Sequence, residues 1–404
     1  MRVLLSTWGS RGDVEPLVAL ASRLRELGAE AVLAAPADEE FTALTDRVGV
    51  PLVPLGPTVR SIVLGERPPS AGAAFQLAPE LVAARYDTLL KLGEDCDALV
   101  ATGLIPVGAR SVADKLGIPY VFACFHTVGL PSPYLPPSAA RPGTPTPEGE
   151  KDVKKLWEYD ALRVSELYGE AENTHRAAIG LPPVNNIRDY VFGDRPWLAA
   201  DPILWPWRSL LSLDVVQTGA WILPDSRPLP DEVEAFLAAG DPPVYVGFGS
   251  MALRGATGIA EDVIPAIRAQ GRRVILGRGW AGLAAIDDRD DCLVVGEVNH
   301  QALFGRVAAV LHHGGAGTTT TASAAGVPQV VIPQIVDQPI WGRRIADLGI
   351  GVLYDGPTPS MESLSAALSV ALSPEVRARA KAVAGAIRTD GTTVAAKMLL
   401  DAVS

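Results

Sequence analysis

The chain has 404 residues, of which 48% are hydrophobic and 20% are charged, and its formal net charge is −11. This length exceeds one ordinary hydrophobic core, so we expect two domains with ample apolar material to bury. The acidic balance argues against a general nucleic-acid or anionic-membrane surface, because both need a basic face. An anionic ligand must therefore be met by local donors.

Three cysteines, Cys96, Cys124 and Cys292, lie far apart and form no CxxC pair. That spacing suggests neither a disulfide framework nor a zinc site, and it fits a reducing cytoplasm. The first residues have too short an apolar run for a signal peptide, and no apolar run reaches the length of a membrane span. We therefore expect a cytoplasmic protein that uses no metal and binds neither membrane nor nucleic acid.

The first part of the chain alternates between short apolar runs and amphipathic stretches. Such alternation predicts a parallel, doubly wound sheet with helices between the strands. The expected elements are strands at 3–6, 31–35, 98–101 and 119–123, and helices at 13–27 and 107–116.

Two stretches interrupt this pattern. Residues 131–150 are rich in Pro, Gly and Ser and cannot form regular structure, so this loop is either disordered or part of a site. Helical sequence resumes over 152–178. The pattern stops again at 223–233, which we interpret as a linker between a domain at 1–222 and a domain at 234–404.

The alternation then restarts and predicts a second Rossmann-like domain, giving an α/β protein. Two such domains would face a central cleft at the carboxyl ends of both sheets, where a ligand is expected. The last helix is apolar enough to cross back to the first domain. The expected elements are strands at 244–248, 273–276, 292–295, 308–311 and 330–333, and helices at 258–270 and about 375–403.

The stretch from His312 to Thr321, HHGGAGTTTT, follows an expected strand and opens a helix. Glycines let a backbone approach a ligand closely, and a helix N-terminus offers free N–H groups to an anion. A diphosphate is the ligand that fits these groups best. Threonines also cap helices without any ligand, but the density of the run, with Asp337 and Gln338 a helix and a strand later, favours a binding site.

A second polar turn, from Gly9 to Asp13, follows the first expected strand. Asp13 is either an ordinary first-turn residue favoured by the helix dipole, or a general base at the top of the sheet. The residues alone leave both interpretations open.

Gly247, Gly249 and Ala252 match a weak dinucleotide fingerprint, and Arg278 follows the next strand, where it could hold a 2′-phosphate. This supports an NADP-dependent alternative. However, no hydride-transfer site follows from the other motifs, and the second glycine turn needs its own anion. We therefore favour one diphosphate between both turns, with Ser250 donating to it.

Six longer stretches accompany the histidine-glycine turn, namely Gly9–Asp13, Lys115–Tyr120, Ile179–Val184, Trp197–Pro202, Gln217–Pro224 and Val294–His300. With them the chain resembles the inverting, two-domain GT-B glycosyltransferases of family 1, and most of all the actinobacterial enzymes that glycosylate vancomycin-type glycopeptides. The resemblance covers essentially the whole chain.

The resemblance implies a nucleotide-sugar donor in the second domain. Val298 would contact the base through its backbone, and Asp337 with Gln338 would hold the sugar. Asp13 would take the acceptor proton, so that the anomeric carbon inverts in one displacement without a metal. The implied diphosphate contacts are Ser250, His313, Gly315, Ala316, Gly317 and Thr318. Further possible donor contacts are Ser10, Gly12, Gly249, Arg278 and Trp280.

Two places depart from the family pattern. Trp341, Arg343 and Arg344 stand where the glycopeptide enzymes usually carry two tyrosines, and they look more like the sterol and lipid glucosyltransferases. Thr321 stands where plant relatives place a Glu that grips the ribose, so dTDP and UDP both stay open.

We therefore predict a metal-independent, inverting hexosyltransferase without a cofactor, acting as a monomer or weak homodimer. It would move a hexose from a dTDP- or UDP-sugar to a hydroxyl of a glycopeptide aglycone or pseudoaglycone, with a polyketide or sterol-like acceptor as the alternative. A nucleotide-sugar 2-epimerase would not need the proline-rich, acceptor-sized loop. A non-catalytic helper would not need an intact turn at 312–319.

Overall fold

The computed structural model describes residues 1–63, 76–103, 105–137, 141–207, 213–250, 256–335, 337–354, 356 and 359–403. The chain forms two compact units. The first contains Met1–Pro202, Pro206–Leu223 and Thr389–Ser404, and the second contains Ile203–Trp205 and Pro224–Arg388.

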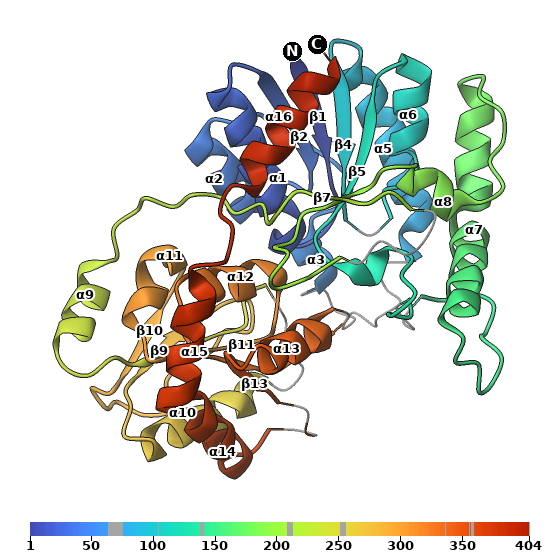
Figure 1. The fold of residues 1–404 in the computed structure, drawn as a ribbon. Helices are drawn as coiled ribbons and strands as arrows, with labels where there is room; N and C mark the ends of the chain where they lie inside the picture. Colours follow the sequence, from blue (N-terminus) through green and yellow to red (C-terminus); the bar gives the residue numbers. More distant parts are fainter. Residues whose placement is uncertain are drawn as a thin grey trace. The chain divides into compact units, whose positions relative to one another are not determined.

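The first unit is a parallel sheet with helices packed on its two faces (Figure 1). Its strands are β1 (Arg2–Ser6), β2 (Glu30–Ala35), β3 (Leu52–Pro54), β4 (Ala98–Ala101), β5 (Tyr120–Cys124), β6 (Trp197–Leu198) and β7 (Val216–Gln217). Its helices are α1 (Arg11–Glu26), α2 (Glu39–Val48), α3 (Val59–Val63), α5 (Ala78–Gly93), α6 (Ala109–Leu116), η1 (Thr127–Gly129), α7 (Val153–Ala178), α8 (Ile187–Phe192) and α16 (Gly391–Val403).

The strand order of the first sheet is β3-β2-β1-β4-β5-β6-β7. The apolar runs of β1 and β4 are buried, as expected of parallel strands with both faces covered. The chain moves outward from β1 to β3 and then returns to β4 on the other side of β1. The strand order reverses at this pair, and doubly wound sheets bind their ligands in a crevice at the carboxyl edge of such a pair.

The second unit repeats this architecture with the strand order β10-β9-β8-β11-β12-β13, so its corresponding crevice lies between β8 and β11. Its strands are β8 (Val244–Gly247), β9 (Val274–Gly277), β10 (Cys292–Val295), β11 (Ala309–His312), β12 (Gln329–Val331) and β13 (Gly351–Leu353). Its helices are α9 (Asp231–Ala238), α10 (Ala256–Ala269), α11 (His300–Leu303), η2 (Phe304–Arg306), α12 (Ala316–Ala324), α13 (Gln338–Asp347), α14 (Met361–Ala371) and α15 (Pro374–Ala384).

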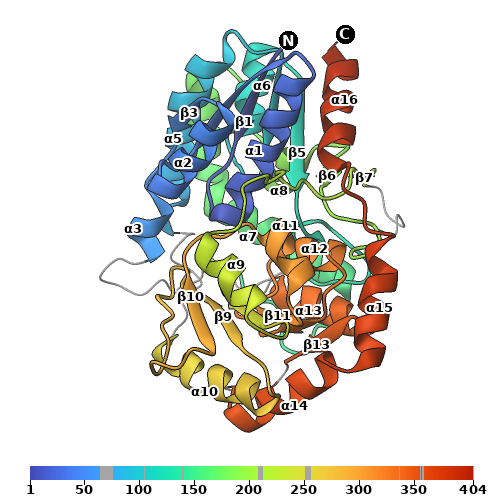
Figure 2. The same ribbon diagram turned by 90° about the vertical axis from the view of Figure 1, so that its left-hand side faces the viewer.

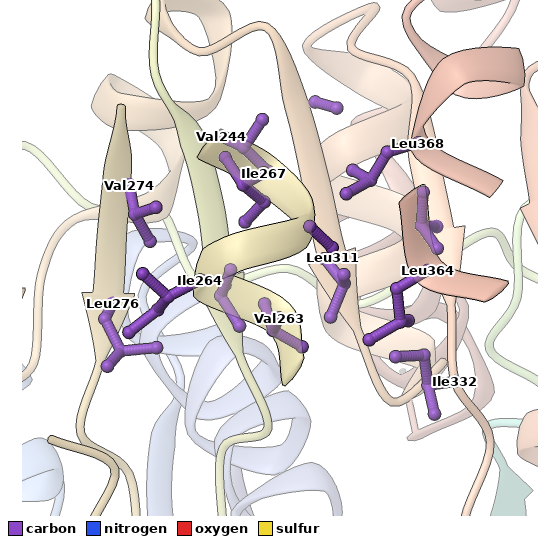
Figure 3. Packing of buried hydrophobic residues seen from close by; sticks show 14 of the residues in the cluster. Val244, Val263, Ile264, Ile267, Val274, Leu276, Leu311, Ile332, Leu364 and Leu368 are labelled. Carbon is purple, nitrogen blue, oxygen red and sulfur yellow. The ribbon is translucent and has the colours of Figure 1, made fainter. Parts of the chain in front are cut away.

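One face of the second sheet is covered by α10 and α14, and Figure 3 shows the side chains that meet there. Val263, Ile264 and Ile267 project from one side of α10, because residues three or four apart share a helix face. Leu364 and Leu368 are related in the same way on α14. All five side chains are fully buried. This apolar layer holds the strands whose carboxyl ends carry the glycine turns.

The structure confirms the expected α/β fold class with two Rossmann-like units. The strands and helices expected in both halves, apart from the last helix, agree with the observed bounds to within about two residues. The short strands β3, β6, β7 and β13 were not expected, since two or three residues carry too little periodicity to be seen.

The last expected helix, 375–403, is wrong as one element, because the structure divides it into α15 and α16. The break follows Gly385, and α16 begins at Gly391, which packs against Gly219 so closely that a Cβ there would collide with backbone. Helix α16 belongs to the first unit and lies beside α1 in both views (Figure 1 and Figure 2).

The segment expected to be a linker, 223–233, is not an open connection. Leu229 is buried in the core of the second unit, and α9 begins at Asp231. The Asn299 side-chain amide donates to the carbonyls of Asp225 and Arg227 at 2.9 and 2.7 Å. Almost all of this segment therefore belongs to the second unit.

Among the described residues, no helix is long and apolar enough to cross a membrane. Cys96, Cys124 and Cys292 are free thiols.

We predict that Leu364→Ala lowers the free energy of unfolding of the second unit by about 2–5 kcal/mol, because it opens a cavity in the apolar layer. Val370→Ala is the control on the same helix, where the side chain is 55% exposed, and it should change the value by less than about 0.5 kcal/mol. Urea denaturation followed by circular dichroism measures both. Equal costs would contradict this account of the core.

Candidate functional site

The two glycine turns of the second unit lie side by side at the crevice between β8 and β11. Their strands are paired so that Gly247 opposes His312, and both turns leave from this carboxyl edge. A Cβ placed on Gly249 would lie 3.6 Å from Cε1 of His313. The turns that the sequence singled out separately therefore form one site.

The N-terminus of α12 is open at this site. Its cap residue is Gly315, which has no side chain to accept from the first helical N–H groups. The bond from the Thr319 N–H to the Gly315 carbonyl, 3.0 Å long, is the first of the helix. The N–H groups of Ala316, Gly317 and Thr318 precede it and have no partner within the helix, so they and the helix dipole can meet an anion.

The His313 ring lies across the same turn. Its Nε2 is 2.5 Å from the position of a Cβ on Gly315, so a larger residue there would collide with the ring. Its Nδ1 is buried and has no hydrogen-bond partner among the described residues. Burial lowers the pKa of His313 to about 4, although the Asp337 carboxylate acts in the opposite direction. The ring is therefore neutral at pH 7 and can donate one hydrogen bond.

A third turn, after β9, completes the edge beside Gly249. The Trp280 N–H donates to the Gly249 carbonyl at 3.0 Å, and a Cβ on Gly279 would lie only 2.7 Å from the same oxygen. The Arg278 side chain is exposed next to this contact, and Ser250 is half-buried. Ala252, the last position of the dinucleotide fingerprint, lies outside the described residues.

Asp337 is held at the start of α13, which follows β12. Its Oδ2 accepts from the indole Nε1 of Trp341 at 2.9 Å. The start of α13 contacts the histidine-glycine turn, because a Cβ on Gly314 would lie 3.1 Å from the Gln338 carbonyl. A carboxylate of fixed orientation therefore lies close to the anion site, where it can accept from hydroxyl groups.

Gln338, the first residue of α13, follows Asp337. Its side chain is buried, and its Oε1 accepts from the N–H groups of Gln334 and Ile335 at 2.7 and 3.1 Å. That oxygen therefore holds the loop before α13.

Val298 contributes its side chain to the core of the second unit, beside Leu303 and Phe304. It precedes Asn299, whose side chain caps α11 by accepting from the Ala302 N–H at 3.1 Å. Any contact between Val298 and a ligand would come from its backbone.

The whole chain is similar to a vancomycin aglycone glucosyltransferase from Amycolatopsis orientalis. The two are 54% identical over 407 residues, which cover 100% of this chain and 98% of that protein. This chain belongs to the GT-B glycosyltransferases of family 1. The glycosyltransferase is also 52% identical to a dTDP-epi-vancosaminyltransferase from the same organism, over 100% of this chain and 98% of the other.

Other comparisons agree with this assignment. Residues 282–396 match the family model of the erythromycin biosynthesis protein CIII-like C-terminal domain. The glycotransferase of kitacinnamycin has the same fold, with a TM-score of 0.75 at 18% identity over 100% of this chain and 99% of that one. The glycosyltransferase SnogD from Streptomyces nogalater superposes with a TM-score of 0.67 at 24% identity, over 100% of this chain and 99% of that one.

In the first unit of the glycosyltransferase, Asp13 lies in the first turn of α1, directly after the carboxyl end of β1. Its carboxylate folds back over Gly9, where a side chain would collide with it, and Oδ2 lies 3.5 Å from Oγ of Ser10. Gly103, in the loop after β4, borders the same crevice, since a Cβ there would lie 3.0 Å from the Trp8 carbonyl. Gly12 is exposed.

The proline-rich loop of the glycosyltransferase, 131–150, contains no helix or strand in its described parts, 131–137 and 141–150. It is fastened to α7 instead. The indole Nε1 of Trp157 donates to the Leu135 carbonyl at 2.9 Å, and Nε of Arg163 donates to the Thr144 carbonyl at 2.8 Å. The contacting residues of α7 recur every three positions, namely Trp157, Asp160, Arg163 and Glu166.

Sequence reasoning missed a short segment that supports the Asp337 side chain. The Trp205 ring meets the Trp341 ring edge-on at 4.9 Å, and Arg344 donates to the Ile203 carbonyl at 2.6 Å. Trp341 and Arg344 were visible as departures from the family pattern. Their partners, Trp205 and Ile203, could not be recognised from the sequence, because they lie more than 130 residues earlier in the chain.

No group of three or more His, Cys, Asp or Glu residues in the described part of the chain is arranged to hold a metal ion. The acidic run at 287–291 is a loop in which Asp287 and Asp291 both pair with Arg268.

We predict that His313 makes the second unit sensitive to acid. Its pKa is lower in the folded chain, about 4, than the ordinary value of 6.5, so the unfolded chain binds more protons between these two values. Stability is therefore lost as the pH falls from about 6.5 to about 4, by at most about 1.4 kcal/mol per pH unit.

The measurement compares the unfolding free energy of the protein with that of His313→Gln from pH 7.5 to pH 4. The unfolding free energy of the unsubstituted protein minus that of the variant should decrease as the pH is lowered, since glutamine does not titrate. A difference that stays constant would show that His313 is not held neutral in the folded chain.

Proposed function

We propose that this glycosyltransferase moves a hexose from a dTDP- or UDP-sugar to a hydroxyl of a natural product. The observation that carries the proposal is the open N-terminus of α12, where three N–H groups and a neutral histidine converge. This is the donor set that a diphosphate needs, because it supplies hydrogen bonds and a positive dipole end without requiring a cation.

In the proposed reaction, the acceptor oxygen attacks the anomeric carbon from the face opposite the diphosphate. The bond from the acceptor oxygen to this carbon forms as the bond from the carbon to the diphosphate oxygen breaks, which inverts the configuration. Asp13 takes the hydroxyl proton, and the nucleoside diphosphate leaves with the electron pair. The α12 N–H groups, His313 and Ser250 meet the charge that develops on the leaving group.

The sugar would be held by Asp337. Its carboxylate is oriented by the Trp341 indole, so it can accept from sugar hydroxyls without first losing rotamer freedom. Gln338, the next residue, would act with it, as the resemblance to the family implies. Arg278, Trp280 and the Val298 backbone lie on the β9 and β10 side, where we place the base and ribose.

The leading acceptor is a glycopeptide aglycone or pseudoaglycone. This choice rests on the printed names of the relatives that are 54% and 52% identical over the whole chain. A sterol or polyketide acceptor is the second choice, since a sterol 3-beta-glucosyltransferase from Arabidopsis thaliana is only 28% identical and the chain covers 65% of it. We further propose that the enzyme needs no metal or cofactor and acts in the cytoplasm as a monomer or weak homodimer.

Transfer to a vancomycin-type aglycone, with dTDP-glucose and UDP-glucose as donors, tests the proposal by mass and anomeric configuration of the product. We predict that Asp13→Asn lowers turnover by about 10²–10⁴-fold, because the amide cannot take the proton. The affinity for the nucleoside diphosphate should stay unchanged.

Asp46→Asn is the matched control, since this exposed carboxylate lies on α2 of the same unit and should leave turnover unchanged. Full turnover by Asp13→Asn would refute the role of Asp13 as base. Absence of any glycosylated product from either donor, with polyketide and sterol acceptors also tried, would refute the function.

A further inference from the structure

The second unit contains a histidine, His312, to which the proposed reaction gives no role. It is the last residue of β11 and is completely buried. Its predecessors in the strand, Ala309, Val310 and Leu311, are apolar, so a polar ring at this position needs a physical reason. Burial lowers the pKa of His312 to about 3, which means that the ring is neutral and pays a desolvation penalty even so.

Both ring nitrogens of His312 have partners, and these partners determine where the proton lies. Nδ1 accepts from the Gly314 N–H at 3.1 Å, so Nδ1 carries no proton. The proton of the neutral ring is then on Nε2, which donates to Oε1 of Gln329 at 2.9 Å. Nε2 of Gln329 in turn donates to Oγ of Ser323 at 3.0 Å.

This chain of hydrogen bonds runs from the residue before the histidine-glycine turn to the C-terminal part of α12 and joins three elements. His312 ends β11, Gln329 begins β12, and Ser323 lies on α12. Gln329 is completely buried and Ser323 almost so, which strengthens the bonds between them and makes a broken one costly.

Gly314 is the point at which this network acts on the turn. Its φ of 91° is in the left-handed region, and a Cβ on it would lie 2.7 Å from Cγ1 of Val331. The bond to His312 fixes the peptide plane between His313 and Gly314. This peptide joins His313 to Gly314, and Gly315, the cap residue of α12, comes next in the chain. Its orientation therefore affects both the His313 ring and the first N–H groups of α12.

We propose that His312 is a positioning residue for the donor diphosphate. It does not touch the donor but holds the Gly314 peptide, and through it the His313 ring and the start of α12, in the arrangement that receives the two phosphates. This inference rests on the proposed function for its ligand, and on the observed hydrogen bonds for the role of His312.

Three substitutions distinguish the hydrogen bond made by Nδ1 of His312 from the one made by Nε2. His312→Asn places an amide oxygen at the position of Nδ1 and keeps an acceptor for Gly314. In His312→Gln the amide lies toward Gln329, but no acceptor stands at the position of Nδ1. His312→Leu has no polar group at either position. Isothermal titration of the full chain with dTDP, UDP, thymidine and uridine gives the affinity for ligands with and without the diphosphate.

We expect His312→Asn to bind the preferred diphosphate within about threefold of the unsubstituted chain. His312→Gln and His312→Leu should bind it about 10-fold or more weakly, with their nucleoside affinity retained. An unchanged diphosphate affinity in His312→Gln would overturn the inference. An equal loss of affinity for the nucleoside would also overturn the inference, because His312 would then stabilise the whole unit and not the diphosphate site.

Hydrogen exchange of the unliganded chain, followed on peptides that cover 311–318, tests the same bond without any ligand. The Gly314 amide should exchange slowly in the unsubstituted chain and in His312→Asn, and about 10-fold faster in His312→Gln. Identical exchange would overturn the inference. Failure of the unsubstituted chain to bind either diphosphate would instead count against the proposed function, while the exchange result would still decide the role of His312.

Discussion

The candidate site of the second unit depends on the three N–H groups at the start of α12, which have no partner within the helix. Because Gly315 occupies the cap position, no cap side chain accepts from them, and they are available to solvent or to a ligand. The turn after β8 approaches this end at Gly249, and the turn after β9 packs on Gly249 through Gly279. A doubly wound sheet places all three turns at its carboxyl edge, so the fold itself assembles the site.

Residues that would not contact a ligand fix the groups around this helix end. Trp341 orients the Asp337 carboxylate and packs against Trp205, and the buried ring of His312 holds Gly314. Both supports lie within the second unit. In the first unit, α7 fastens the proline-rich loop that leaves β5. The Asp337 carboxylate and the Gly314 peptide are thus each supported by a buried side chain.

Much of the fold and of the site follows from local sequence. The buried strands are apolar runs, and the histidine-glycine turn and Asp13 are each contained in five to ten residues. What could not be predicted depends on distant partners. Arg344 bonds to Ile203, 141 residues away, and the contacts of His312 with Gln329 require the β11–β12 pairing. After the break between α15 and α16, Gly391 packs against Gly219, a contact that no periodicity reveals.

We infer that the open end of α12 binds the diphosphate of a nucleotide sugar. Equilibrium titration of the chain and of His313→Ala with dTDP, UDP and NADP⁺ tests it most directly. We expect dTDP or UDP to bind and the substitution to weaken this binding about 10-fold, while binding of the glycopeptide acceptor is unaffected. Binding of NADP⁺ alone, or diphosphate binding that does not respond to the loss of His313, would contradict it.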